Sequence, residues 1–288
     1  ITTGSSGAFL LTFLSCFDPG AKVAIFNPVY PAYRNILKSL NIEVIEIYPN
    51  SDKINKIDIN SISEHRVDGL IISNPNNPNG QIFSKEELKF IYEYCEANKI
   101  VLISDEIYHG IEFGEKTSSM LNFGEKSIVV NSFSKFFCMP GWRLGWVVIT
   151  KELIENFLKL SQNIFISSGN IAQYSALKVF DCIDELKKLV YEYKCVRDEV
   201  SEKLKSISQV NFIQPDGAFY FYLDISKTKL ESVDFADRLI QETGVVVTPG
   251  IDFDKRFGKK TIRLSFSNKP EIVLNATEEI LSWFKKNY

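Results

Sequence analysis

The sequence predicts an α/β protein with a mostly parallel sheet that has helices on both faces, followed by a smaller C-terminal α+β unit. Short β-branched and apolar runs alternate with helical stretches through the first half of the 288 residues, as in repeated βαβ units. Several of these runs end directly in asparagine, aspartate or lysine, and parallel sheets bind ligands at this carboxyl edge. Beyond residue 207 strand-like runs dominate, which predicts the second unit.

The composition is that of an ordinary globular protein, with 45% hydrophobic and 24% charged residues. A net charge of −3 gives no basic field, which argues against a nucleic-acid partner. No apolar run approaches the roughly 18 residues of a membrane span. The five cysteines lack metal-ligand spacing and fit reduced thiols, so we expect a cytoplasmic protein, and the two histidines are too few for a histidine-based metal site. The chain starts at Ile1, and we expect a further segment before it.

The N-terminal stretch predicts a strand stub, a glycine-rich turn and then an apolar helix over residues 8–17. Gly4 and Gly7 allow a tight turn, and the amides of Ser5 and Ser6 would point out of the helix N-terminus. Such a terminus favours an anion because unpaired N–H groups and the helix dipole both face it. A plain loop-to-helix cap explains the pattern equally well.

The next elements form a βαβ pattern around a proline-stiffened loop. Residues 22–26 read as a buried strand, and the prolines at 28 and 31 fix where Tyr30 points. Tyr30 could stack on a planar ligand, although a core tyrosine is the simpler alternative. A helix over 33–40 and a strand over 43–48 follow.

A buried strand over residues 70–73 runs into a loop rich in asparagine and proline that ends at Gly80. Turn chemistry alone favours these residue types. Asn77 nevertheless stands just after a strand's carboxyl end, where a ligand would be met. Ser84 and Glu87 have the spacing of a capping box, which predicts a helix running to about residue 97.

The strand beginning near residue 100 ends in Asp105, with Tyr108 three residues further on. A carboxylate at a buried strand end is desolvated and needs a cationic partner to stay ionised. A helix-capping aspartate is the alternative.

Lys135 follows a buried strand over 128–130 and the polar residues Ser132 and Ser134. Aromatic and sulfur side chains come next, over 136–139, and would solvate an ammonium group poorly. Poor solvation lowers the pKa of a lysine and makes its amine nucleophilic toward a carbonyl. A surface lysine whose head reaches water is the alternative.

The remaining candidates are two arginines. Arg143 lies in Gly-Trp-Arg-Leu-Gly, where a fixed guanidinium could fork onto a phosphate or make a structural ion pair. Arg263 lies within an apolar strand over 261–266 and either meets a buried anion or faces water. Other strands are expected over 210–213, 218–223 and 244–248, helices over 232–243 and 270–286, and a long, mostly helical stretch over 169–207.

Taken together, these motifs resemble the class I/II aminotransferases, the fold-type I pyridoxal-phosphate enzymes related to aspartate aminotransferase. The resemblance is carried in chain order by Asn77 in Asn-Pro-Asn-Asn-Pro-Asn-Gly, Asp105 and Tyr108 in Asp-Glu-Ile-Tyr, Lys135 in Ser-Phe-Ser-Lys, Arg143 in Gly-Trp-Arg-Leu-Gly, and Arg263 in Arg-Leu-Ser-Phe.

The resemblance implies a role for each residue. Lys135 forms the internal aldimine with pyridoxal 5'-phosphate and moves the substrate's proton, while Asp105 pairs with the pyridine nitrogen so that the ring acts as an electron sink. Asn77 and Tyr108 bond the phenolic oxygen of the ring, and Tyr30 stacks on the ring. The phosphate is held by Ser5, Ser6, Ser132 or Ser134, and Arg143. Arg263 clamps the substrate α-carboxylate, with Asn77 beside it.

By the same resemblance we expect a transaminase that uses an L-amino acid and a 2-oxo acid, with 2-oxoglutarate as the expected acceptor, and a homodimer. A large cofactor domain would span 1–190 and a small domain 191–288, joined by the helical stretch over 169–207. The family's segment before the Gly-Ser-Ser-Gly loop is not in this sequence, so substrate choice stays open. A C–S β-lyase of the same fold and a non-catalytic cofactor-binding module are the alternative functions.

Overall fold

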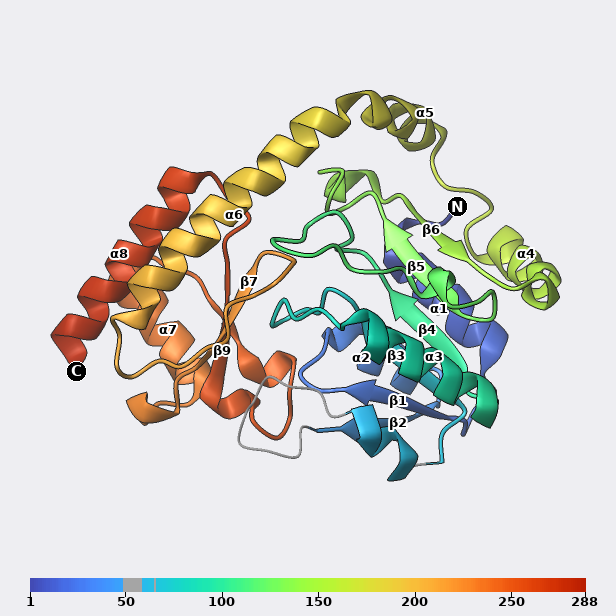
Figure 1. The fold of residues 1–288 in the computed structure, drawn as a ribbon, viewed down its shortest axis with the longest axis horizontal. Coiled ribbons are helices and arrows are strands. Elements are labelled where there is room, and N and C mark those ends of the chain that lie inside the picture. The colour runs from blue at the N-terminus through green and yellow to red at the C-terminus, as the bar shows by residue number, and fades with distance from the viewer. Residues whose placement is uncertain (49–58, 65) are drawn as a thin grey trace.

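The computed structural model describes residues 1–48, 59–64 and 66–288, so His65 lies outside the described residues. Two sheets lie side by side, and one long helix spans the distance between them (Figure 1). Among the described residues, no helix is long and apolar enough to cross a membrane, and no group of three His, Cys, Asp or Glu side chains is placed to hold a metal ion.

The larger sheet has six strands in the order β2-β1-β3-β4-β5-β6. The strands are β1 (Lys22–Phe26), β2 (Glu43–Ile47), β3 (Gly69–Ser73), β4 (Val101–Asp105), β5 (Ile128–Ser132) and β6 (Gly145–Val148). The first five are parallel, and β6 runs antiparallel to β5 at the edge. This is the mostly parallel sheet that the sequence predicts. Its strands contain apolar runs because a parallel sheet is covered on both faces.

Helices cover both faces of this sheet. Alternate strand residues point to opposite faces: Ile71 packs with the helices α1 (Gly4–Cys16) and α2 (Pro31–Ser39). Leu70 packs instead with α3 (Lys85–Asn98) on the opposite face. The capping box of α3 is confirmed, with Ser84 Oγ accepting from the amide of Glu87 at 3.1 Å.

The smaller sheet is antiparallel, in the order β7-β9-β8. Its strands are β7 (Tyr220–Asp224), β8 (Thr248–Pro249) and β9 (Thr261–Ser265), and it packs with α7 (Ser232–Thr243) and α8 (Pro270–Asn287). The helical stretch before it consists of α4 (Ile154–Ile164), α5 (Asn170–Val179), a 3₁₀ turn and α6 (Ile183–Lys205). The domain boundary near residue 190 falls inside α6 and stays a prediction.

Three expected elements differ from the structure. The first helix begins at Gly4 rather than at residue 8. Gly4 alone makes the tight turn, with a φ of +73° in the left-handed region, so the residues that follow it are already helical. Residues 210–213 form only an isolated bridge between Asn211 and Asp224. Residues 244–247 show alternating burial, but the ladder with β9 begins only at Thr248, because the chain has just left α7 through Gly244, with a φ of +76°, and crosses to the sheet over the residues between.

Two loops connect the units close to the sheet's carboxyl edge. The amides of Asp216 and Gly217 both donate to the carbonyl oxygen of Gly80, at 3.0 and 2.9 Å. Side chains at these glycines would not fit, because a Cβ on Gly80 would lie 2.4 Å from the Gly217 oxygen. The asparagine-rich loop after β3 is therefore locked against the segment that leads into β7.

Candidate active site

A cavity of about 280 Å³ opens at the carboxyl edge of the large sheet, where β4 and β5 end. It is lined by Ser5, Ser6, Tyr30, Asn77, Asp105, Ile107, Tyr108, Ser134, Lys135, Pro140, Arg143, Tyr220 and Arg263. All the site residues expected from the sequence are in this lining except Ser132. Segments far apart in the chain, from the first helix to β9, thus meet at one place.

Asp105 ends β4 and is buried. The hydroxyl group of Tyr33 donates to Oδ2, and the amide of Ile107 donates to Oδ1 at 3.1 Å. Burial raises the pKa of Asp105 to about 6, although both hydrogen bonds act in the opposite direction. The carboxylate has no ion-pair partner among the described residues, so a cationic ligand group in the cavity would stabilise its charged form.

Lys135 follows β5 and points its amine into the same cavity. Burial lowers the pKa of Lys135, the positive charges of Arg263 and Arg143 lower it further, and Asp105 opposes them. The rings closest to the amine differ from those expected: Nζ lies 5.7 Å from the ring centroids of both Tyr108 and Phe219. The sequence predicted that Phe136 and Phe137 would surround the amine. Phe137 instead packs against Phe133, because the chain turns away after Lys135.

Arg143 lies over the N-terminus of α1. A Cβ on Gly4 would be 2.5 Å from Nη2 of Arg143, so the close approach requires glycine. Arg143 donates from Nη1 to the carbonyl oxygen of Pro140 at 2.9 Å and forms no ion pair with a described carboxylate. A guanidinium beside the positive end of a helix dipole is unfavourable unless an anion joins them. With Ser5, Ser6 and Ser134 alongside, the arrangement fits a phosphate.

Ser132 is buried beneath this region rather than lining it. Its hydroxyl group donates to the carbonyl oxygen of Leu144 at 3.0 Å and lies 2.9 Å from the hydroxyl oxygen of Ser134. Of the two serines expected to hold the phosphate, the structure places Ser134 in the cavity and Ser132 behind it.

Arg263 reaches the cavity from β9. Its Nη1 donates to Asn77 Oδ1 at 2.8 Å, which joins the small sheet to the loop after β3. The guanidinium carbon lies 4.2 Å from the ring centroid of Tyr220 and 4.6 Å from that of Phe253. Nε is buried without a partner among the described residues, and no described carboxylate neutralises the charge. These features fit a guanidinium that binds an anionic ligand.

Two site residues were not found by sequence reasoning. Tyr33 is fully buried, bonds Asp105 and packs edge-on against Tyr30 with ring centroids 5.6 Å apart. Tyr220 lines the cavity, and its hydroxyl oxygen lies 3.0 Å from that of Tyr108. In the sequence, Tyr33 is marked only by its position three residues after Tyr30, in Tyr-Pro-Ala-Tyr. Tyr220 lies in a run of aromatic residues, and nothing in that run distinguishes it from its neighbours.

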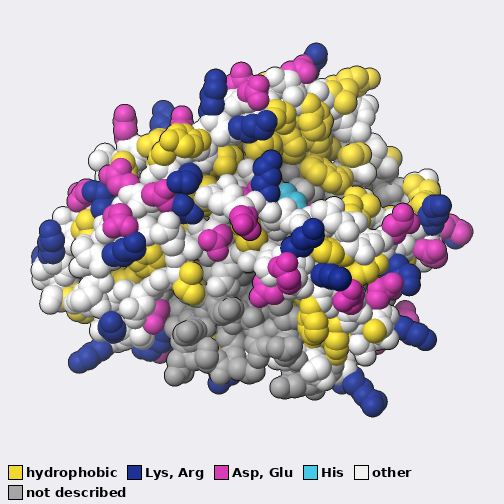
Figure 2. Space-filling view, in the orientation of Figure 1, with side chains coloured by type: hydrophobic (Ala, Val, Ile, Leu, Met, Phe, Trp, Pro, Cys, Tyr) yellow, Lys and Arg dark blue, Asp and Glu magenta, His cyan; other side chains and the backbone are white. Residues whose placement is uncertain are grey.

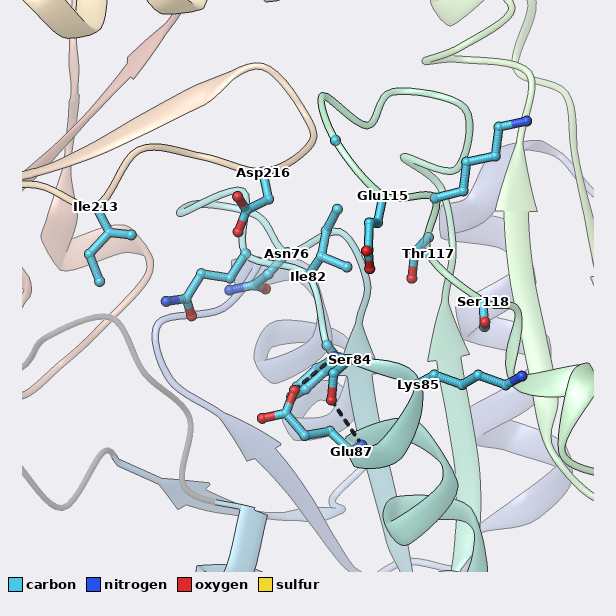
Figure 3. Close-up of a pocket in the computed structure, with 14 residues that line it drawn as sticks. Asn76, Ile82, Ser84, Lys85, Glu87, Glu115, Thr117, Ser118, Ile213 and Asp216 are labelled. Carbon is cyan, nitrogen blue, oxygen red and sulfur yellow. Dashed lines mark hydrogen bonds between the residues drawn. The ribbon is translucent and has the colours of Figure 1, made fainter.

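A second cavity, of about 710 Å³, is lined in part by Asn76, the residue before Asn77 in the sequence (Figure 3). Asn76 and Asp216 face each other there, with Glu115 on the opposite wall. Its lysines, Lys85 and Lys116, are exposed and therefore hydrated as ordinary cations. This cavity has no desolvated amine and is not the candidate active site.

The smaller cavity has a matching group for each polar part of pyridoxal phosphate. A desolvated amine suits the aldehyde, a buried carboxylate suits the ring nitrogen, hydroxyl and amide groups suit the phenolic oxygen, and a guanidinium at a helix N-terminus suits the phosphate. This donor set, on a mostly parallel α/β sheet, defines the class of fold-type I pyridoxal-phosphate enzymes.

Comparison with known proteins gives the family. The family described as "Aminotransferase class I and II" matches residues 1–280, and the chain belongs to it. Its members use pyridoxal 5'-phosphate, and the chain is accordingly an aminotransferase-family enzyme.

Individual relatives are similar to this chain over most of its length. Valine–pyruvate aminotransferase of Mycobacterium tuberculosis is 37% identical over 98% of this chain and 74% of its own length. A (5-formylfuran-3-yl)methyl phosphate transaminase of Methanocaldococcus jannaschii is 35% identical over 99% of this chain and 75% of its own length. The crystal structure of an aminotransferase from Mycobacterium tuberculosis gives a TM-score of 0.95 at 36% identity and covers 99% of this chain and 75% of that one.

The buried carboxyl of Asp105 should make the cofactor-free protein less stable as pH rises. The carboxyl binds its proton more tightly in the folded state, with a pKa near 6, than in the unfolded state at 3.8. Folding is therefore disfavoured progressively between about pH 4 and 6, by roughly 2–3 kcal/mol in total. Asp105→Asn should remove this loss and be more stable than the wild type at pH 7 but not at pH 4. Urea unfolding of both proteins between pH 4 and 7 measures the free energy of unfolding. Identical pH profiles for the two proteins would contradict the prediction.

Proposed function

We propose that this chain transfers an amino group between an L-amino acid and a 2-oxo acid in two half-reactions on pyridoxal phosphate. The observation that carries the proposal is that Lys135, Asp105 and Arg263 line one cavity. A nucleophilic amine, a carboxylate for a ring nitrogen and a cation for a substrate carboxylate are the minimum set for this chemistry.

The residues that would hold the cofactor follow from the lining. Asp105 would meet the ring nitrogen, kept in place by the hydroxyl group of Tyr33 and the amide of Ile107. Tyr30 would lie against the ring, supported by its edge-on contact with Tyr33. The phosphate would lie between Arg143 and the hydroxyl groups of Ser5, Ser6 and Ser134, and Tyr108 and Asn77 would donate to the phenolic oxygen.

When bound, pyridoxal phosphate supplies an electron sink for the charge that develops at the substrate α-carbon. The protein supplies the proton transfer and the orientation. Lys135, whose pKa is lowered mainly by burial, is neutral more often than a surface lysine and can take and return the α-proton. Arg263 would hold the α-carboxylate, and its contacts with Tyr220 and Phe253 fix the plane of the guanidinium.

The charges in the cavity support a substrate with an uncharged side chain. Lys135, Arg143 and Arg263 are its cations, and each has a proposed partner. In the described part of the chain, no fourth cation lines the cavity to receive a second substrate carboxylate. Because one relative is named for valine and pyruvate, we choose valine as the first donor to test. The same argument favours pyruvate as acceptor, to be tested beside 2-oxoglutarate, which the resemblance predicts.

We also propose a homodimer, the assembly general among relatives. Ile171, Tyr174 and Leu177 follow one face of α5 at three-residue spacing and are 77%, 74% and 66% exposed. Figure 2 shows hydrophobic side chains gathered over this part of the molecule. A continuous apolar helix face of this kind is typical of a protein interface.

Lys135→Ala should abolish the visible absorption that pyridoxal phosphate gives on forming its covalent bond to the protein. Among the described residues, no other side-chain amine lines the cavity to replace it. Absorption spectra of wild type and variant with added cofactor measure the effect. Lys85→Ala in the larger cavity is the matched control and should keep the band. A band retained by Lys135→Ala would remove Lys135 from its proposed role.

The loaded enzyme should convert valine only in the presence of a 2-oxo acid acceptor, because each turnover must return the cofactor to its starting form. Chromatographic measurement of the new amino acid, with pyruvate and with 2-oxoglutarate, tests this and ranks the two acceptors. Ammonia released without an acceptor would instead support the β-lyase alternative. Cofactor binding without turnover of any amino acid would support a non-catalytic module.

Leu177→Asp should convert a dimer to monomers, since burying an unpaired carboxylate in an apolar interface costs several kcal/mol. Light scattering after size-exclusion chromatography measures the mass. Val246→Asp, which changes an exposed apolar residue away from α5, is the control. A wild-type mass of one chain, or a variant that stays dimeric, would contradict the proposed interface.

A further inference from the structure

Tyr220 lies between Arg263, which would bind the substrate carboxylate, and Tyr108, which would contact the cofactor. Its ring faces the guanidinium of Arg263, whose central carbon is 4.2 Å from the ring centroid. Its hydroxyl oxygen lies 3.0 Å from that of Tyr108, and the two rings meet edge-on with centroids 5.8 Å apart. Both tyrosines are buried, yet both line the cavity.

The two hydroxyl groups leave one hydrogen for a ligand. Burial raises the pKa of both phenols, so each carries its proton at neutral pH. Either oxygen can be the donor in their mutual bond, and among the described residues neither has another hydrogen-bond partner. The pair therefore holds two hydrogens, of which one is used between them and one is left for a group in the cavity.

The charge of Arg263 selects the direction of the bond. A cation beside a phenol stabilises negative charge on its oxygen, which makes that phenol the better donor. Arg263 lies directly over the Tyr220 ring and lowers the pKa of Tyr220 most strongly of all neighbouring groups. Tyr220 should then donate to Tyr108, and the hydrogen of Tyr108 points into the cavity. Hydrogen bonds in such a chain strengthen one another.

We propose that Tyr220 is a positioning residue that directs the hydroxyl hydrogen of Tyr108 toward the phenolic oxygen of the cofactor and links this bond to the charge state of Arg263. The inference rests on the proposed function and extends it, since Tyr220 connects the substrate clamp to the cofactor without touching the reacting atoms. A substrate carboxylate on Arg263 would offset the guanidinium charge, weaken the donor strength of Tyr220 and make the cofactor's oxygen more basic.

The alternative is that Tyr220 only packs. Tyr222 provides the comparison, because it lies two residues along β7 and is also buried. Its hydroxyl group accepts a hydrogen bond from Thr261 Oγ1 at 2.6 Å, outside the cavity lining. Loss of either hydroxyl group should cost similar stability. Only the loss of the hydroxyl group at 220 should change the chemistry of the bound cofactor.

The test is a pH titration of the visible absorption band of the protein loaded with pyridoxal phosphate. Tyr220→Phe should raise the midpoint by roughly 0.3–0.6 pH unit, because a weaker donor to the phenolic oxygen makes the bound cofactor hold its proton more tightly. Tyr222→Phe should leave the midpoint unchanged. In a Tyr108→Phe background, the Tyr220→Phe change should produce no further shift, since its effect passes through Tyr108.

The other charged or titratable groups of the cavity, Tyr30, Asp105, Lys135, Arg143 and Arg263, are the same in all these proteins, so the comparison isolates the two hydroxyl groups. Tyr220→Met, which also lacks the hydroxyl group, repeats the measurement if Tyr220→Phe does not fold.

An unchanged midpoint in Tyr220→Phe, an equal shift in Tyr222→Phe, or a full shift in the Tyr108→Phe background would each overturn the inference. A wild-type protein that shows no band at all would overturn the proposed function as well. A normal band with an unchanged Tyr220→Phe midpoint overturns the inference alone.

Discussion

The organisation of this protein depends on holding three charged groups in one partly desolvated cavity without pairing them with one another. Asp105, Lys135 and Arg263 line the same space, and none of them forms an ion pair with a described residue. Removing charges from water is costly unless hydrogen bonds or ligands compensate. The surrounding fold supplies part of this compensation, and the chemistry of the groups supports a ligand that supplies the rest.

The compensation comes from neutral hydrogen-bond donors and acceptors and from aromatic faces rather than from counter-charges. Tyr33 and the amide of Ile107 support Asp105, and Asn77 and two rings support Arg263. Neutral partners fix the position of a charge while leaving it unneutralised, so it can still interact with a ligand. A carboxylate beside Arg263 would have removed that capacity.

Several features could be predicted because they depend on local sequence. The buried strand runs give β1, β3, β4 and β5, and the spacing of Ser84 and Glu87 gives the capping box of α3. Residues at or shortly after the end of a parallel strand, such as Asp105 and Lys135, could be assigned to one sheet edge because all parallel strands end there. Strand-like patterns failed at 210–213, which form a single bridge to Asp224 at the end of β7, and at 244–247, which connect the end of α7 to β8.

The sequence by itself determined the class of fold, the order of the chemical groups along the chain and, through the motifs that hold Lys135, Asp105 and Arg263, the family. The tertiary structure decided which side chains touch them. Tyr33, Phe219 and Tyr220 come from elements separated from their partners by tens of residues, and no local pattern encodes those contacts. The physical reason is that propensity and capping act over one or two turns of chain, whereas desolvation and hydrogen-bond direction depend on every element packed around a group.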